Sequence, residues 1–299
     1  MTKASYTLLD DRGVLEIGGA DRREFLQGLI SNDTRKLSGA RALYAAFLTP
    51  QGKYLHDFFL AETGETLLLD GERARLADLR RRLSIYKLRA KVTIEDASER
   101  FLVVAAFGAD APGKLGIGAE AGAATAFGGG TAYVDPRLSA LGARLLLPRR
   151  DGTAALDAKD FARADADTYD RLRLSFGIAD GSRDLPVEKA ILLEAGFDEL
   201  NGVDWDKGCY IGQELTARTK YRALIKKRLM PVKVEGPLPA PGSAVMLGDQ
   251  EAGEIRSGSG DIALALLRLE AVEAAAKDGT PLTAGTARLS PIKPEWARF

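Results

Sequence analysis

The chain has 299 residues, of which 45% are hydrophobic and 28% are charged, an ordinary globular balance with room for two or three domains. Its 42 Lys and Arg residues equal its 42 Asp and Glu residues, so no net charge draws it to nucleic acid or to an anionic membrane. A single cysteine excludes an internal disulfide, and no stretch approaches the roughly 20 apolar residues of a membrane span. With no apolar leader near Met1, we expect a cytoplasmic protein.

The first half of the chain mixes helices with strands on short links. A capping pattern at Asp21 and apolar residues at helical spacing predict a helix that ends near Ser31. Further strands and one helix follow, and their expected ranges are strands 43–48, 54–60 and 66–69, helix 72–83, and strands 91–95 and 101–107. This mixture indicates an α+β class rather than a doubly wound parallel sheet.

The second half begins with a Gly- and Ala-rich stretch, 108–130, which we expect to be a surface excursion. Strands are then predicted at 131–134 and 143–147, and helices near 159–166 and 168–176. From about Ala223, short apolar runs at 229–234, 244–247, 262–268 and 281–287, separated by Gly and Pro, predict a small antiparallel β-barrel. We therefore divide the chain into an α+β region, 1–222, which could comprise two intertwined subdomains, and a C-terminal barrel, 223–299.

The only cysteine, Cys209, lies between Gly208 and Gly212 and just before a predicted helix that starts at about Gln213. A helix N-terminus and the nearby ammonium of Lys207 would both favour its thiolate, as in a reactive or metal-ligating cysteine. Free cysteine is also among the most buried residue types, so a packing role is the competing interpretation.

Metal ligation by this chain alone is disfavoured, because an iron–sulfur cluster usually needs four ligands and the chain has one Cys and one His. The histidine, His56, lies in a predicted strand, where its side chain points to the opposite face from those of Leu55 and Asp57. A packing or surface role is therefore expected. We predict no permanently bound metal. Any cluster would be shared with a partner, a second copy or a small molecule.

The run Lys207-Gly208-Cys209-Tyr210-Ile211-Gly212-Gln213-Glu214 resembles the signature of the YgfZ-type folate-binding proteins. These are iron–sulfur cluster assembly factors related to the glycine-cleavage T-protein, an aminomethyltransferase. Weaker landmarks of the same family lie at 27–33, 51–53, 86–89, 198–206, 217–222 and 226–229. One departure is Ala223, where the family commonly has glycine.

The resemblance implies T-protein-like intertwined α+β domains around a central channel that holds tetrahydrofolate, followed by an antiparallel β-barrel. It also implies a role in the assembly or repair of [4Fe-4S] clusters, with A-type carrier proteins and client [4Fe-4S] enzymes as partners. Cys209 would be the functional thiol. Whether the chain turns over a substrate is left open, and a folate-dependent transferase is the expected activity if it does.

Folate sites need a carboxylate or amide for the pterin, an apolar slot and cations for the glutamate tail. Glu194 resembles the T-protein glutamate that pairs with the pterin, and Asp57 lies near the position of its catalytic aspartate. The paired aspartates of the T-protein are not reproduced, because His56 precedes Asp57. From the octapeptide and the basic residues after it, we also assign cofactor binding to three residues: Lys207, Gln213 and Arg218.

Two basic clusters, within 73–91 and 218–228, could form a cationic rim for a polyglutamylated folate or a docking patch for an acidic carrier. The competing interpretation is a set of solvated surface charges, and no RNA-binding signature accompanies them.

Three other functions stay open. They are a folate-dependent aminomethyl or one-carbon transferase, a thiol hydrolase or transferase with Cys209 as nucleophile and His56 as its base, and a structural adaptor in which Cys209 is silent.

Overall fold

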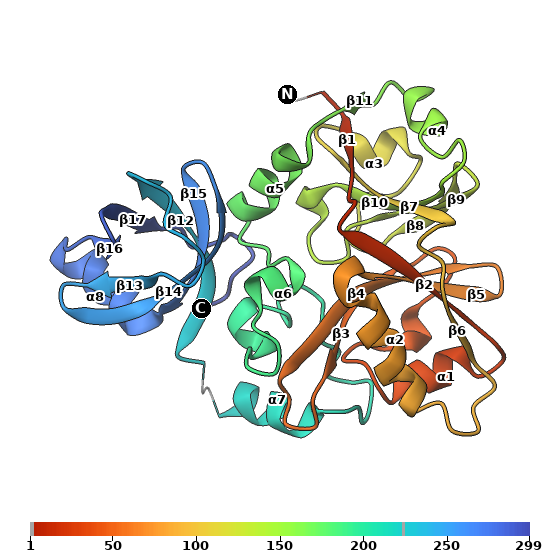
Figure 1. Ribbon diagram of the computed structural model, residues 1–299, viewed down its shortest axis with the longest axis horizontal. Coiled ribbons are helices and arrows are strands. Elements are labelled where there is room, and N and C mark those ends of the chain that lie inside the picture. Colours follow the sequence, from red (N-terminus) through yellow and green to blue (C-terminus); the bar gives the residue numbers. More distant parts are fainter. Residues whose placement is uncertain (1–2, 223–224) are drawn as a thin grey trace. The chain divides into compact units, whose positions relative to one another are not determined.

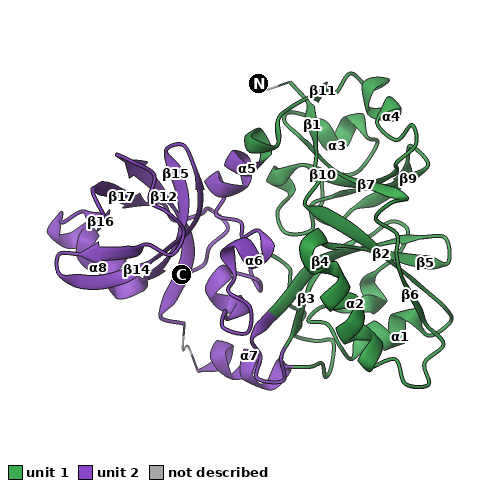
Figure 2. Cartoon of the chain, viewed as in Figure 1, with its two compact units in different colours: residues 1–48, 55–169, 200–211 green, residues 49–54, 170–199, 212–299 purple. Residues whose placement is uncertain are grey.

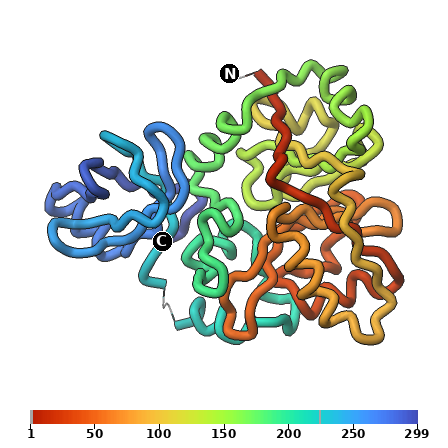
Figure 3. The backbone as a smooth tube through the Cα atoms, viewed as in Figure 1, coloured from red at the N-terminus to blue at the C-terminus, as the bar shows by residue number. Residues whose placement is uncertain are grey.

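The computed structural model describes residues 3–222 and 225–299, and Figure 1 shows the order of its elements. The chain divides into two compact units (Figure 2). Unit 1 comprises residues 1–48, 55–169 and 200–211, and unit 2 comprises residues 49–54, 170–199 and 212–299. Each unit is built from several separate stretches of the chain. Figure 3 shows the path of the backbone through them. The boundary and the family departure noted at Ala223 lie outside the described residues.

Unit 1 contains a six-stranded sheet in the order β11-β1-β7-β10-β9-β8. Its strands are β1 (Ser5–Leu8), β7 (Phe101–Phe107), β8 (Ala124–Phe127), β9 (Gly130–Val134), β10 (Ala143–Pro148) and β11 (Ala162–Arg163). Among the described strands of this sheet, only β1 and β11 pair in parallel. The inward residues of β7 and β10, such as Val104 and Leu145, are fully buried and form a core with the short helix α3 (Ala111–Lys114).

A second sheet has five strands, in the order β3-β4-β5-β2-β6. Its strands are β2 (Arg12–Gly18), β3 (Leu43–Leu48), β4 (Tyr54–Thr63), β5 (Thr66–Glu72) and β6 (Thr93–Asp96). Helix α2 (Leu76–Ile85) buries Leu76, Leu79 and Leu83 in this unit. The remaining short helices of unit 1 are α1 (Arg22–Gln27), α4 (Ala154–Asp157), η1 (Thr34–Lys36), η2 (Arg73–Arg75) and η3 (Ser139–Leu141).

A buried ion cluster joins the two sheets of unit 1. Asp70 on β5 is fully buried and accepts hydrogen bonds from Arg12 Nε of β2 at 2.7 Å and from Arg144 of β10 at 2.6 Å. The Phe59 ring lies against both guanidinium groups, 4.0 Å from that of Arg144. Burial alone would raise the pKa of Asp70, but the two arginines outweigh it and hold the pKa below its ordinary value.

Unit 2 ends in a closed barrel, β12-β15-β14-β13-β16-β17, in which neighbouring strands are antiparallel. Its elements are β12 (Lys227–Glu235), β13 (Ala244–Leu247), β14 (Gln250–Ser259), β15 (Ile262–Arg268), α8 (Leu269–Asp278), β16 (Leu282–Ala284) and β17 (Ala287–Pro291). Before the barrel come α6 (Gly181–Asp184), η4 (Leu192–Ala195) and α7 (Gln213–Tyr221), while α5 (Ala166–Ser175) runs from one unit into the other. The predicted α+β class with an antiparallel C-terminal barrel is confirmed.

Several predicted elements differ from the structure. The helix at Asp21 ends at Gln27, because Ile30 forms a β-bridge with Phe47 and the next backbone N–H also bonds to β3. The stretch 108–130 contains α3 and strand β8, and the predicted helix at 159–166 is replaced by β11. Among the described residues, no helix is long and apolar enough to cross a membrane.

Candidate functional site

Cys209 lies in an irregular stretch that precedes α7, as predicted, and its side chain is exposed. Gly208 and Gly212 on either side have φ of +88° and +83°, values that disfavour residues with a side chain. A Cβ at Gly208 would meet no atom within 4 Å, so the backbone conformation and not crowding calls for glycine there. The two glycines therefore shape the loop that exposes the thiol.

The residues just before this loop are held by the landmark Gln27–Asp33, which we term the cradle. The contacts within unit 1 are Ser31 Oγ to Gly202 O (2.6 Å), Asp204 N to Ser31 O (2.9 Å), Asn32 Nδ2 to Asn201 O (2.7 Å) and Gln27 Nε2 to Lys207 O (3.1 Å). Gln27, Ser31 and Asn32 are all buried. Since buried polar groups are costly to leave unpaired, these bonds fix the base of the Cys209 loop.

The ammonium of Lys207 is part of the same contact. It donates to Gln27 O at 2.6 Å and to Ile30 O at 2.5 Å, at the C-terminal end of α1, and it lies 5.1 Å from the centre of the Tyr210 ring. Burial lowers the pKa of Lys207 to about 8, against the opposing influence of Asp33. The ammonium thus satisfies backbone carbonyls, and its predicted role in cofactor binding stays a prediction.

Ion pairs fix the end of the cradle and the residues that follow it. Asp33 accepts from Arg35 NH2 at 2.9 Å and from Gln27 Nε2 at 3.0 Å, and Lys36 forms an ion pair with Asp204. The hydrogen bond from Arg35 lowers the pKa of Asp33 to about 2. Asp33 therefore stays ionised at neutral pH and holds the turn that follows α1.

Asp57 lies on β4 in unit 1, and its side chain is buried. Tyr44 Oη donates to its carboxylate at 2.9 Å. Burial, and then the Asp57 charge, raise the pKa of Tyr44 well above its ordinary value, so Tyr44 remains a donor. The guanidinium of Arg137 lies 5.4 Å from the centre of the Tyr44 ring and 4.8 Å from that of Phe59. Asp57 thus has a hydrogen-bonded, partly aromatic setting, and its catalytic role stays a prediction.

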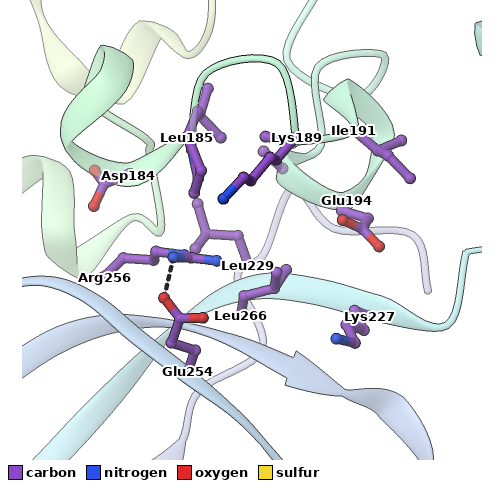
Figure 4. A pocket seen from close by; sticks show the side chains of 13 residues that line it. Asp184, Leu185, Lys189, Ile191, Glu194, Lys227, Leu229, Glu254, Arg256 and Leu266 are labelled. Atoms are coloured by element: carbon purple, nitrogen blue, oxygen red, sulfur yellow. Dashed lines mark hydrogen bonds and ion pairs between the residues drawn. The ribbon is translucent and has the colours of Figure 1, made fainter. Parts of the chain in front are cut away.

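Glu194 belongs to η4 in unit 2 and lines a pocket of about 410 Å³ (Figure 4). Among the described residues, no hydrogen bond or ion pair holds its carboxylate. Burial raises the pKa of Glu194, while Lys227 and Lys53 act in the opposite direction. The other lining side chains include apolar and cationic groups: Leu185, Pro186, Ile191, Leu229, Leu266, Lys189, Lys227 and Arg256.

Gln213 and Arg218 both belong to α7. Gln213 is its first residue and is half-buried, whereas Arg218 is exposed and pairs with Glu214 one turn earlier at 2.9 Å. The structure therefore separates the predicted residues into two groups. Cys209, Lys207 and Asp57 lie in unit 1, and Glu194, Gln213 and Arg218 lie in unit 2.

His56 is buried on β4, and its Nε2 lies 3.1 Å from Asp78 Oδ2 of α2. Burial and then the charge of Arg75 lower the pKa of His56 to about 4, against the opposing effect of Asp78. In the part of the chain that the structure describes, no hydrogen bond joins His56 to the exposed thiol of Cys209. This arrangement does not form the nucleophile–base pair that a thiol hydrolase requires.

Most residues of the basic clusters have local partners. Arg73 pairs with Glu99, Arg81 and Arg82 pair with Asp78, and Arg75 and Arg80 donate to backbone carbonyls. In the second cluster, Arg228 is buried and donates to Glu199 at 2.6 Å and to Leu193 O at 2.9 Å. Within 3–222 and 225–299, no group of three or more His, Cys, Asp or Glu residues is arranged to hold a metal ion.

Sequence reasoning missed part of the Glu194 pocket. Glu254 and Arg256 form an ion pair on β14, a strand that was not predicted, and Leu266 comes from β15. The stretch 250–259 has only two apolar side chains, Ala252 and Ile255, so its sequence carried no strand pattern that predicted β14.

The fold is that of the aminomethyltransferases of the glycine cleavage system. The crystal structure of aminomethyltransferase T from Bartonella henselae matches 99% of this chain and 87% of that chain with a TM-score of 0.78, at 14% sequence identity. Residues 226–299 match the family model described as the CAF17 C-terminal β-barrel domain.

Relatives of known sequence define the family more closely. The chain is 39% identical over 287 residues to the mitochondrial iron-sulfur cluster assembly factor IBA57 of Mus musculus, covering 89% of this chain and 78% of that protein. It is 37% identical over 284 residues to the protein of the same name from Homo sapiens, with the same coverage. This chain belongs to the IBA57 family, which confirms the resemblance to the YgfZ-type proteins.

Proposed function

We propose that this chain is an accessory factor for the assembly or repair of [4Fe-4S] clusters, that it binds tetrahydrofolate, and that it uses the thiol of Cys209. Membership of the IBA57 family supports the first part, because its curated members are named iron–sulfur cluster assembly factors. One observation supports the role of Cys209: the thiol is exposed on a loop whose base is fixed by the cradle.

Cysteine thiolates are the usual protein ligands of iron–sulfur clusters, and most clusters take four. One thiol cannot meet that demand, so Cys209 acts transiently with a partner that supplies the other ligands. A-type carrier proteins and client [4Fe-4S] enzymes are the partners that we propose. The cluster is cargo and not a resident cofactor of this chain.

The assembly role is tested by deleting the gene and measuring a [4Fe-4S] enzyme, such as aconitase, beside an enzyme without a cluster, such as malate dehydrogenase. The account predicts a loss of the first activity alone, restored by the full chain. Equal aconitase activity with and without the gene would reject the assembly role.

The folate proposal is supported by the chemistry of the Glu194 pocket. The pocket combines an unpartnered carboxylate, which can accept from the donor edge of a pterin, with apolar walls and with lysines that suit a glutamate tail. Its volume of about 410 Å³ lies within the usual range for ligand sites. Figure 4 shows Lys189 and Glu194 on the same side of the pocket, with Lys227 on the barrel strand opposite.

Titration of the purified chain with tetrahydrofolate tests this site. We expect Glu194→Ala to weaken binding by one to two orders of magnitude, the effect of losing about 1.5–3 kcal/mol from a charged hydrogen bond. The matched control is Glu251→Ala, an exposed carboxylate on β14 that should bind like the wild type. Equal affinity in all three proteins would remove Glu194 from the site.

The aminomethyltransferase alternative is tested with the same protein. If the chain turns over an aminomethyl donor with tetrahydrofolate, and Asp57→Asn abolishes that turnover, the chain is a transferase. Absence of turnover would favour the assembly role.

The compartment is a further proposal: we place the chain in the cytoplasm, whereas its curated relatives are named mitochondrial. Fractionation of cells of the source organism, probed with an antibody to the chain, distinguishes the two.

A further inference from the structure

Residues 85–91, the last residue of α2 and the stretch that follows it in unit 1, expose apolar side chains to an unusual degree. The exposed fraction is 61% for Ile85, 40% for Tyr86 and 90% for Leu88. Single exposed apolar residues are common on protein surfaces, but three within four positions are the pattern of a contact site. We term residues 85–91 the docking segment.

Three cations accompany these apolar groups. Lys87, Arg89 and Lys91 are exposed, and none of them has an ion pair with another residue that the structure describes. Their neighbours on α2 differ, since Arg81 and Arg82 pair with Asp78. Although the Asp21 carboxylate accepts from the backbone N–H of Lys91 at 2.7 Å, the three cations have no ion pair among the described residues. Beside exposed apolar groups, they complement a surface that is both acidic and apolar.

Leu88 is also held in a strained backbone conformation. Its φ is +40°, in the region that favours glycine and asparagine and costs other residues about 1–2 kcal/mol. Its side chain is almost fully exposed, so packing within the chain does not offset this strain. Such strain is typical of functional surfaces.

The docking segment is linked to the Cys209 loop through contacts within unit 1. The Tyr86 ring packs edge-on against Phe47 at 6.1 Å between ring centres, and Phe47 forms a β-bridge with Ile30. Ile30 O in turn accepts a hydrogen bond from the ammonium of Lys207, which lies two residues before Cys209. A partner seated on the docking segment therefore rests on the same framework that carries the thiol.

We propose that the docking segment binds the protein that exchanges a cluster with Cys209, through an acidic and apolar surface of that protein. Leu88 and Ile85 enter apolar depressions of the partner, and its carboxylates meet the three cations. The inference rests on the proposed function, because it names the partner surface for the same thiol.

A membrane is the weaker candidate for this surface. Interfacial membrane binding uses an amphipathic helix or a lipid anchor, whereas residues 86–91 are not helical and offer few apolar groups. A small apolar centre with a charged rim is instead the usual anatomy of a protein interface.

Photo-crosslinking in living cells tests the proposal. The full chain carries p-benzoylphenylalanine at position 88, and the crosslinked peptide is identified by mass spectrometry. We expect a protein that carries or receives iron–sulfur clusters, joined through a peptide of net negative charge. The double variant Lys87→Glu with Arg89→Glu should reduce the yield roughly tenfold, while the control Lys277→Glu, an exposed cation on α8, should not. No crosslink, or transfer to lipid alone, would overturn the proposal.

A second variant separates docking from folding. Leu88→Asn suits the positive φ, so it should keep or raise the thermal midpoint while reducing aconitase activity in cells at least severalfold. Unchanged aconitase activity in Leu88→Asn cells would contradict the docking role. The proposed function fails separately: if Cys209→Ala leaves aconitase intact, the thiol is dispensable, whatever the crosslink at position 88 shows.

Discussion

The buried state of His56 gives this protein a predictable sensitivity to acid. Burial lowers the pKa of His56 to about 4, from about 6.5 in the unfolded chain. The unfolded state therefore binds the proton more readily. The contribution to stability is intact above about pH 6.5 and is lost as the pH falls towards 4. Because of the difference between the two pKa values, the free energy of unfolding falls by about 2 kcal/mol when the pH is lowered from 7.5 to 5.

The comparison that isolates this effect is between the wild type and His56→Gln, which cannot titrate. Urea denaturation at pH 7.5 and pH 5 can be followed by the fluorescence of Trp205, which lies in the same unit as His56. Trp296, which lies in unit 2, is replaced by phenylalanine in both proteins. We expect His56→Gln to be less stable than the wild type at pH 7.5 but to lose about 2 kcal/mol less on acidification.

Parallel losses in the two proteins would refute the reasoning, because they would show that His56 titrates alike in the folded and unfolded states. A histidine that acted as a base for Cys209 would instead give His56→Gln a thiol with altered alkylation kinetics near pH 7. We expect the rate of Cys209 alkylation by iodoacetamide to be the same in both proteins.

Two further predictions concern the framework of unit 1. Asp70→Asn leaves the guanidinium groups of Arg12 and Arg144 without a buried counter-charge and should lower the free energy of unfolding in urea by about 3–5 kcal/mol. The exposed control Glu99→Gln should lower it by at most about 1 kcal/mol. Equal losses in the two variants would contradict the account. Gln27→Leu should cost about 1–3 kcal/mol and speed amide hydrogen exchange in residues 201–209 but not in the barrel strands, and unchanged exchange there would show that the cradle does not hold the loop.

The elements predicted best from sequence are those with uninterrupted apolar runs. The bounds of β3, β7 and β15 agree with the prediction, because their residues are mostly buried and match a strand pattern by themselves. Strand β14 was missed since its pairing with β13 and β15, and not its own composition, determines its conformation. Strand β11 has two residues and exists only through its parallel pairing with β1.

The candidate site shows the same division. The octapeptide around Cys209 was recognisable from sequence, and so was the landmark at 27–33. Their contact was not, because the bonded residues lie 169 to 180 positions apart and no spacing rule relates them. The ammonium of Lys207 was expected to act on the thiol, but it is bound to the carbonyls of Gln27 and Ile30, which only the folded chain brings within reach.

The central claim is that the exposed thiol of Cys209 serves the assembly of [4Fe-4S] clusters. The most direct measurement compares aconitase activity in cells that contain the wild-type chain or Cys209→Ala as the only copy, at matched protein levels. Because the side chain is exposed, the substitution should leave the thermal midpoint unchanged. The account predicts that aconitase activity falls towards that of the deletion strain, while malate dehydrogenase activity is unaffected. Full aconitase activity with Cys209→Ala would contradict it.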